Sequence, residues 1–223
     1  MKNNYYKFEK ESEAIAWLTK KYDKFTKELQ KNNFENGTLG NAIFSYTGNM
    51  SSEYNKIIKI NGGTIINIDK MIDQYYDDSQ KDDEYEKSLS EDTKNNIKLI
   101  YNAFSQNVIE DNIMLFHYFN LNYYADYILK VQKGQNFKIN NFISTTMTKK
   151  FTDLSNLIRE KKYNSLLIIK VKRGTQCIPI GNNPESVLKE NEIILKPGSC
   201  FVINKIKKRI FGRIKCVIEC ELI

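Results

Sequence analysis

Apolar residues recur at helical spacing through the first hundred residues of the chain. Between residues 13 and 29 they fall every three or four positions along one stripe, which is the spacing of one face of a helix. The polar stretch 77–92 is expected to be a solvated loop or the start of a helix. The same spacing predicts three further helices, at residues 51–59, 65–76 and 92–107.

After about residue 110, the pattern changes to short apolar runs separated by turn residues, which is typical of strands. The Lys-rich segment 205–215 is expected to form a hairpin that turns near Phe211 and Gly212. Strands are predicted at residues 113–118, 137–146, 165–171, 176–180, 192–195, 200–206 and 215–222, with helices at 123–131 and 152–161.

This order of elements predicts an α+β fold, in which N-terminal helices pack on a mainly antiparallel, two-sheet β core. The helical part is expected over residues 1–108 and the β core over 109–223. No internal repeat and no linker divides the sequence, so we expect one domain over residues 1–223. A chain of 223 residues with 41% hydrophobic residues is large enough to bury a core.

Charge and cysteine content narrow the possible functions. The net charge of +7 comes almost entirely from lysine and suits either an anionic ligand or a solubility surface. Four cysteines without a CxxC pair, and a single distant histidine, argue against a metal site and favour reduced thiols. The chain has no apolar run of about 18 residues, so no membrane span is expected. Its start lacks the apolar region of a signal peptide.

Three short segments carry candidate chemistry: LFHY at 115–118, FISTT at 142–146 and ENEIILKPGS at 190–199. Glu190 and Glu192 lie on one side of the predicted strand, about 7 Å apart. Two such carboxylates can divide the work of breaking a glycosidic bond: one stabilises the sugar cation and the other accepts a proton. Taken singly, each segment also fits an ordinary strand.

Together, the order, spacing and flanks of these segments resemble the arginine-serine-glutamate class of bacterial toxin-type mono-ADP-ribosyltransferases. Further segments, EAIAWLTKKYDKF at 13–25, AIFSYTG at 42–48 and YNKIIK at 54–59, resemble clostridial Rho-modifying exoenzymes and actin-modifying binary toxins. The resemblance covers nearly the whole chain. It implies the ADP-ribosyltransferase fold, NAD as the substrate and no metal.

The resemblance also implies roles for individual residues. Glu192 would bond the 2′-hydroxyl of the nicotinamide ribose and stabilise the oxocarbenium ion, while Ser144 would anchor Glu192. Glu190 would orient or deprotonate the acceptor, and a Glu at this position is similar to the arginine-modifying members. Phe151 would lie in the loop that covers nicotinamide, and the loop 181–191 would meet the target protein. The remaining residues assigned to NAD binding are Lys59, His117, Tyr118 and Thr145.

Two positions depart from the class pattern. His117 stands where the class has its arginine, and no arginine precedes Arg159. Lys59 likewise replaces an arginine of the toxin pattern. A neutral imidazole can hydrogen-bond a ribose hydroxyl, as on the first core strand of the diphtheria-toxin-like class, but it cannot fork two bonds to a pyrophosphate. Lys59, Lys149 and Lys150 are the candidates for holding the phosphates.

Two functions follow from the resemblance. The first is an enzyme that moves ADP-ribose from NAD to a side chain of a target protein, expected to be arginine, and releases nicotinamide. The alternative is a catalytically impaired copy of the fold that acts as a docking module, as in binary toxins. Nucleic-acid binding by residues 205–215 leaves the order of the motifs unexplained. The expected partners are NAD, a host acceptor protein and a delivery partner, and the expected place of action is a target-cell cytosol.

Overall fold

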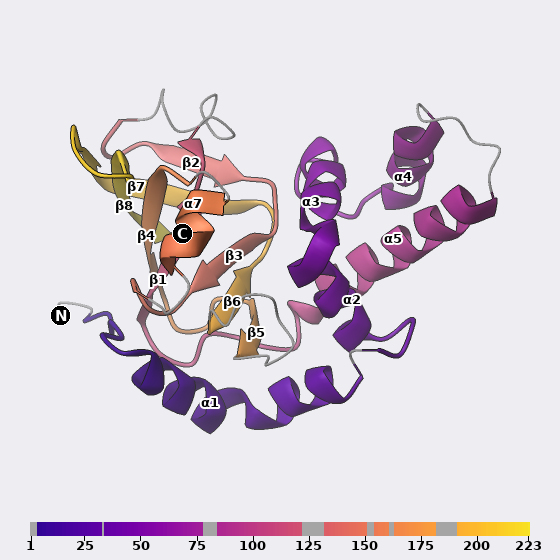
Figure 1. Cartoon of the computed structure of the whole chain (residues 1–223), viewed down its shortest axis with the longest axis horizontal. Coiled ribbons are helices and arrows are strands. Elements are labelled where there is room, and N and C mark those ends of the chain that lie inside the picture. Colours follow the sequence, from indigo (N-terminus) through magenta and orange to yellow (C-terminus); the bar gives the residue numbers. More distant parts are fainter. Residues whose placement is uncertain are drawn as a thin grey trace.

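The computed structural model describes residues 4–32, 34–77, 84–121, 132–150, 154–160, 163–181 and 191–223. The chain begins with a run of helices and continues as a curled sheet, with one short helix on it (Figure 1). The helices are α1 (Glu11–Lys31), α2 (Leu39–Ser45), the π-helical turn η1 (Tyr46–Met50), α3 (Ser51–Ile60), α4 (Ile68–Asp77), α5 (Glu84–Ala103) and α7 (Leu154–Glu160).

The predicted helices correspond to α1, α3, α4, α5 and α7, with shifted ends. Helix α5 begins at Glu84, inside the polar stretch 77–92. The helix α2 and the turn η1 are additional elements, because Thr38 caps α2 through its side chain and the chain continues through η1 directly into α3. The helix predicted at 123–131 lies outside the described residues.

Eight strands form one hydrogen-bonded sheet, in the order β2-β7-β8-β4-β1-β3-β6-β5. Strands β4 and β8 pair in parallel and the other neighbours pair antiparallel, so the α+β class is confirmed. The strands are β1 (Ile113–Phe119), β2 (Asn136–Ile139), β3 (Ile143–Thr146), β4 (Ser165–Val171), β5 (Cys177–Gly181), β6 (Glu192–Leu195), β7 (Ser199–Lys208) and β8 (Cys216–Leu222).

The single strand predicted at 137–146 is wrong, because the chain turns a corner at Asn140 and Asn141 and forms two separate strands. Strands β2 and β3 are five places apart in the sheet, and so are β6 and β7. Four residue steps, as from Ile139 to Ile143 or from Leu195 to Ser199, span at most about 14 Å. Five strand spacings in a flat sheet span about 24 Å. The sheet must therefore curl, and the expected two-sheet core is made by the two halves of one sheet.

The curled sheet creates two main apolar clusters. The first joins one face of all eight strands and is completed by α1 through Ala14 and Leu18. The second lies on the outer face of β5 and β6, where Ile178 and Ile194 pack against helices α2 to α5. Figure 1 shows these helices on one side of the sheet, with α1 running beneath β5 and β6. Among the described residues, no helix is long and apolar enough to cross a bilayer.

Candidate active site

Glu192 and Ser144 lie next to each other on the outer face of the sheet, toward the helices. In the antiparallel pair of β3 and β6, Thr146 is opposite Glu192 and Ser144 is opposite Ile194. Because side chains alternate along a strand, Ser144 and Glu192 are diagonal neighbours on one face. The Ser144 hydroxyl hydrogen-bonds the Glu192 carboxylate. Strand pairing therefore brings together the two residues to which the family resemblance gave a joint role.

A third hydroxyl joins this pair from the helical layer. The Tyr46 hydroxyl lies 3.0 Å from the Ser144 Oγ, and Tyr46 is 1% exposed. Its ring packs against Tyr54 and Phe142. When Glu192 is ionised, Ser144 donates its single hydroxyl proton to the carboxylate, and the Tyr46 hydroxyl then donates to Ser144. The result is a relay of hydrogen bonds from Tyr46 through Ser144 to Glu192.

The Glu192 carboxyl is held in an environment that disfavours its charge. The residue is 8% exposed, and burial raises its pKa from 4.5 to about 7, against the opposing effect of the Ser144 hydrogen bond. The carboxyl is therefore near half ionisation at neutral pH. A carboxylate in such poorly solvated surroundings interacts more strongly with a nearby positive charge than it would in water.

His117 leaves β1 on the opposite face of the sheet from Glu192, together with Leu115 and Phe119 of the central cluster. Its ring stacks on Phe119 with centroids 5.7 Å apart. Its Nδ1 lies 2.7 Å from the Ser144 carbonyl oxygen. Because a carbonyl oxygen only accepts, Nδ1 carries the proton, and in the neutral ring Nε2 is then an acceptor. Burial lowers the pKa of His117 to about 4, so the imidazole is neutral at physiological pH.

The position of His117 follows from a divergence between β1 and β3. These strands share one register pair, Phe116 with Thr146, and separate beyond it. If the β1–β3 pairing continued, a backbone N–H would donate to the Ser144 carbonyl oxygen. Here the His117 imidazole donates to it instead. Ser144 thus connects two site residues, through its hydroxyl to Glu192 and through its carbonyl to His117.

The other sequence-predicted site residues are spread over different surroundings. The Thr145 hydroxyl donates to the Ile193 carbonyl over 2.6 Å and ties β3 to β6. The Tyr118 hydroxyl donates to the Lys149 carbonyl over 2.5 Å, and its ring packs in the cluster beneath α7. Lys59 is exposed in the last turn of α3. Glu190 and Phe151 lie outside the described residues.

The strand that carries Glu192 is bracketed by two unusual backbone positions. Asn191, 1% exposed, has a positive φ of 48°. After β6, Gly198 donates its N–H to the Ile139 carbonyl over 2.8 Å. A Cβ on Gly63 would come within 2.7 Å of the Gly198 nitrogen. The turn after α3 therefore packs directly on the turn after β6, which fixes the helical layer against the site strand.

Sequence reasoning did not assign a role to Tyr46, although it lies in the AIFSYTG segment that carries part of the family resemblance. The available signal was the Tyr-Thr-Gly itself, whose tyrosine stands where α2 passes into the π-helical turn and contacts Ser144 through its hydroxyl. Among the described residues, no group of three or more histidine, cysteine or acidic side chains could hold a metal. The four cysteines are free, and three of them are buried.

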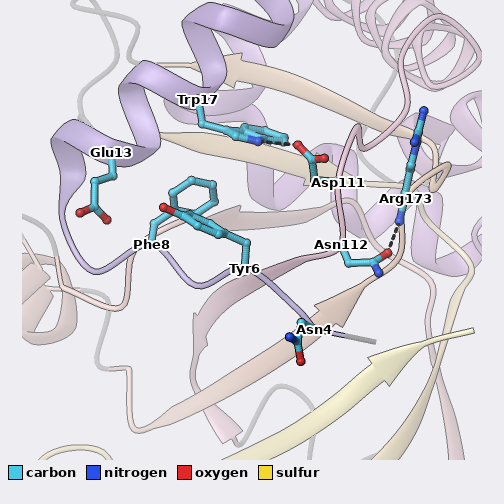
Figure 2. A pocket seen from close by; sticks show the side chains of 8 residues that line it. All are labelled: Asn4, Tyr6, Phe8, Glu13, Trp17, Asp111, Asn112 and Arg173. Atoms are coloured by element: carbon cyan, nitrogen blue, oxygen red, sulfur yellow. Dashed lines mark hydrogen bonds between the residues drawn. The ribbon is translucent and has the colours of Figure 1, made fainter. Parts of the chain in front are cut away.

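A pocket of about 650 Å³ lies elsewhere, where the N-terminal segment crosses the start of α1 (Figure 2). Two hydrogen bonds join residues that line it. The Trp17 indole donates to Asp111 over 2.9 Å, and the Arg173 backbone N–H donates to the Asn112 side chain over 3.0 Å. Backbone hydrogen bonds of Tyr6 with Asn112 and Met114 hold the N-terminal segment beside β1. None of the residues assigned to catalysis or NAD binding lines the pocket.

The fold matches several solved structures at low sequence identity. C3stau2 from S. aureus, solved with NAD, has a TM-score of 0.67 at 14% identity, with 99% of each chain covered. The C3 exoenzyme of Clostridium limosum has a TM-score of 0.66 at 18% identity, covering 99% of this chain and 98% of that one. The toxin BECa of C. perfringens, solved with NADH, has a TM-score of 0.66 at 18% identity, and the match covers 99% of this chain and 50% of the BECa chain.

Among curated proteins, no sequence matches the chain. Likeness to solved structures at this level of identity establishes the fold. The family follows from the sequence profile of the ADP-ribosyltransferase exoenzymes, which matches residues 14–223. That match includes the segments bearing His117, Ser144 and Glu192. With the helical layer, the curled sheet and the paired serine and glutamate in place, the chain belongs to the ADP-ribosyltransferase exoenzyme family.

Proposed function

We propose that the chain is a mono-ADP-ribosyltransferase that cleaves NAD and transfers ADP-ribose to a side chain of a target protein. The observation that carries the proposal is the buried Glu192 carboxyl, hydrogen-bonded by Ser144, in a chain of this family. The structurally similar C3stau2 and the toxin BECa were solved with NAD and NADH, respectively, which supports NAD as the substrate.

In the proposed reaction, the bond between the nicotinamide nitrogen and ribose C1′ breaks, and neutral nicotinamide leaves with the bonding electrons. The positive charge of the nicotinamide ring passes to the ribose as an oxocarbenium-like cation. Glu192 accepts a hydrogen bond from the ribose 2′-hydroxyl and stabilises this cation. The acceptor nucleophile then attacks C1′ and gives its proton to Glu190. Glu190 at this position supports arginine as the acceptor residue.

The environment of Glu192 fits this role electrostatically. A fixed carboxylate that is removed from water stabilises a developing positive charge more strongly than a solvated one. The positive nicotinamide ring of bound NAD would itself favour the ionised carboxyl and lower the pKa of Glu192. The relay from Tyr46 through Ser144 holds the carboxylate in one orientation.

His117 has a different role from the arginine of the class. Its neutral ring donates Nδ1–H to the Ser144 carbonyl from the face of the sheet opposite Glu192, so its proposed role is to position Ser144, and it carries no charge for the pyrophosphate. We assign the phosphates to Lys59, Lys149 and Lys150, which are exposed. The free cysteines fit action in the reducing cytosol of a target cell.

The substitution of arginine by His117 also supports a second candidate, a docking module of the same fold that has lost catalysis. Such a module would bind a delivery partner and would not turn over NAD. Retention of Ser144 and Glu192 in hydrogen-bonding contact favours the enzyme, because docking places no demand on a buried carboxyl.

Adenylate-labelled NAD, incubated with the protein and a host-cell lysate, distinguishes the two functions. We expect labelled protein bands with the wild type and with Glu28→Gln, which changes an exposed glutamate of α1. Glu192→Gln should abolish the bands. Release of nicotinamide without lysate provides a second readout that needs no acceptor. Neither labelling nor nicotinamide release at saturating NAD would reject the enzyme and favour the docking module.

A further inference from the structure

The positive charge of the chain is concentrated in one hairpin. Residues 205–215 (KIKKRIFGRIK) contain six basic residues and no acidic ones. The chain as a whole has a net charge of +7, so the other 212 residues contribute 28 basic against 27 acidic side chains. The segment joins the ends of β7 and β8. The hairpin therefore accounts for nearly all of the net positive charge of the chain.

The tip of this hairpin also exposes two adjacent large apolar side chains. Ile210 is 84% exposed and Phe211 is 87% exposed, more than any other large apolar residue in the described part of the chain. Isolated exposed apolar residues are common on protein surfaces. An exposed pair at the end of a projection, flanked by cations on both sides, is a feature of interaction surfaces.

The tip has a defined shape. The Arg209 N–H donates to the Lys215 carbonyl over 2.7 Å, and the Lys215 Nζ donates to the Ile210 carbonyl over 3.0 Å. Gly212 completes the turn with a φ of 89°. These bonds close the loop at its base, so Ile210 and Phe211 project outward instead of folding back on the sheet. Figure 1 shows the hairpin strands at the edge of the molecule remote from helices α2 to α5.

Most of the flanking charge is available to a partner. Lys207 is paired with Glu219 at 2.8 Å on the neighbouring strand, and Glu219 also feels the charge of Lys205. Lys208, Arg209 and Arg213 stand closer to the tip and are exposed. The cations therefore gather around the apolar pair, with the acidic neighbour set back toward the sheet.

We propose that the hairpin 205–215 docks on an anionic lipid bilayer, with Ile210 and Phe211 entering the interface and the basic side chains binding lipid phosphates. A bilayer surface has negative headgroups directly above an apolar layer. The basic side chains of the hairpin match the headgroups, and the apolar pair at its tip matches the layer beneath. The phosphates of a nucleic acid would pair with the basic side chains and a base would stack on Phe211, but Ile210 would stay in water. This docking is independent of NAD chemistry and would hold the enzyme at a membrane surface.

Sedimentation of the full chain with vesicles tests the proposal. We expect binding to vesicles of phosphatidylcholine mixed with phosphatidylserine, little binding to phosphatidylcholine alone, and weakening at high salt. Changing Ile210 and Phe211 together to serine should weaken binding about tenfold, since the apolar contribution is lost. Ile66→Ser is the matched control, because Ile66 is 70% exposed in a turn remote in sequence, and it should bind as the wild type does.

Removal of charge provides the second arm. Each basic residue near an anionic membrane contributes about a fivefold change in partitioning, so alanine at Lys208, Arg209 and Arg213 should weaken binding roughly a hundredfold. A control variant removes the same number of exposed basic residues elsewhere. Its substituted residues are Lys10, Lys20 and Lys24. Equal losses in the two triple variants would mean that net charge alone drives adsorption, and would overturn the proposal.

Insertion of the tip can be detected directly. Phe211→Trp should give a tryptophan signal that brominated lipids quench, whereas Trp17 of the wild type packs on Phe8 and should remain unquenched. Binding that persists unchanged in the Ile210 and Phe211 serine variant, or tighter binding of a duplex oligonucleotide than of anionic vesicles, would refute membrane docking and favour a nucleic-acid surface.

Discussion

The buried carboxyl of Glu192 lowers the stability of the folded chain wherever it is ionised, and Glu192→Gln should remove that effect. Burial gives Glu192 a pKa of about 7 against an ordinary 4.5, so the folded state binds the proton more tightly than the unfolded state. The wild type therefore loses stability, relative to the Gln variant, as pH rises from about 4.5 to 7, and the difference is constant above. At about 1.4 kcal/mol per pKa unit, the difference reaches about 3 kcal/mol at pH 8 and about 1 kcal/mol at pH 5.

Urea unfolding of both proteins, without NAD, measures this difference between pH 5 and pH 8. At pH 8 the variant should be more stable by about 3 kcal/mol, which for a chain of this size corresponds to roughly 6–12 °C in Tm. Glu28→Gln, at an exposed position of α1, should show no such trend. A stability difference that does not change with pH, or a Gln variant less stable than the wild type at pH 8, would show that the Glu192 carboxyl is solvated.

Two further outcomes follow from the site geometry. Ser144→Ala removes the hydrogen bond that lowers the pKa of Glu192, so the acid limb of the pH profile of nicotinamide release should move up by about one pH unit, with activity recovered at high pH. Gly63→Ala should destabilise the fold by roughly 2–4 kcal/mol in urea unfolding, because its Cβ would meet the Gly198 nitrogen at 2.7 Å. Gly62→Ala, where the added Cβ meets open space, should lose only about 1 kcal/mol.

The sequence pattern predicted the bounds of an element correctly where local signals and tertiary structure agree. Strands β4 and β6 have the predicted bounds, because each is a short apolar run ended by turn or polar residues. The hairpin of β7 and β8 turns where Gly212 permits a positive φ. The run 137–146 misled because its apolar pattern continues across Asn140 and Asn141, while a corner between two sheet halves depends on partners distant in sequence.

The candidate site shows the same division. The family resemblance implied that Ser144 anchors Glu192, and the pairing of β3 with β6 places the two side chains on one face. The bond from His117 to the Ser144 carbonyl could not be predicted, since it requires β1 and β3 to diverge after a single register pair. The contact of Tyr46 with Ser144 joins the end of α2 to β3, 98 residues later, which no local pattern in the sequence specified.

The burial that makes Glu192 destabilising is also what suits it to the proposed reaction. If its carboxyl were solvated, its pKa would lie near 4.5 and the folded state would be more stable at neutral pH. Water would then screen the interaction of the carboxylate with a sugar cation. Ser144 moderates this conflict by bonding the ionised form, and Tyr46 in turn orients Ser144. The chain therefore keeps a carboxyl that is ionisable at neutral pH in surroundings apolar enough for its charge to act at full strength.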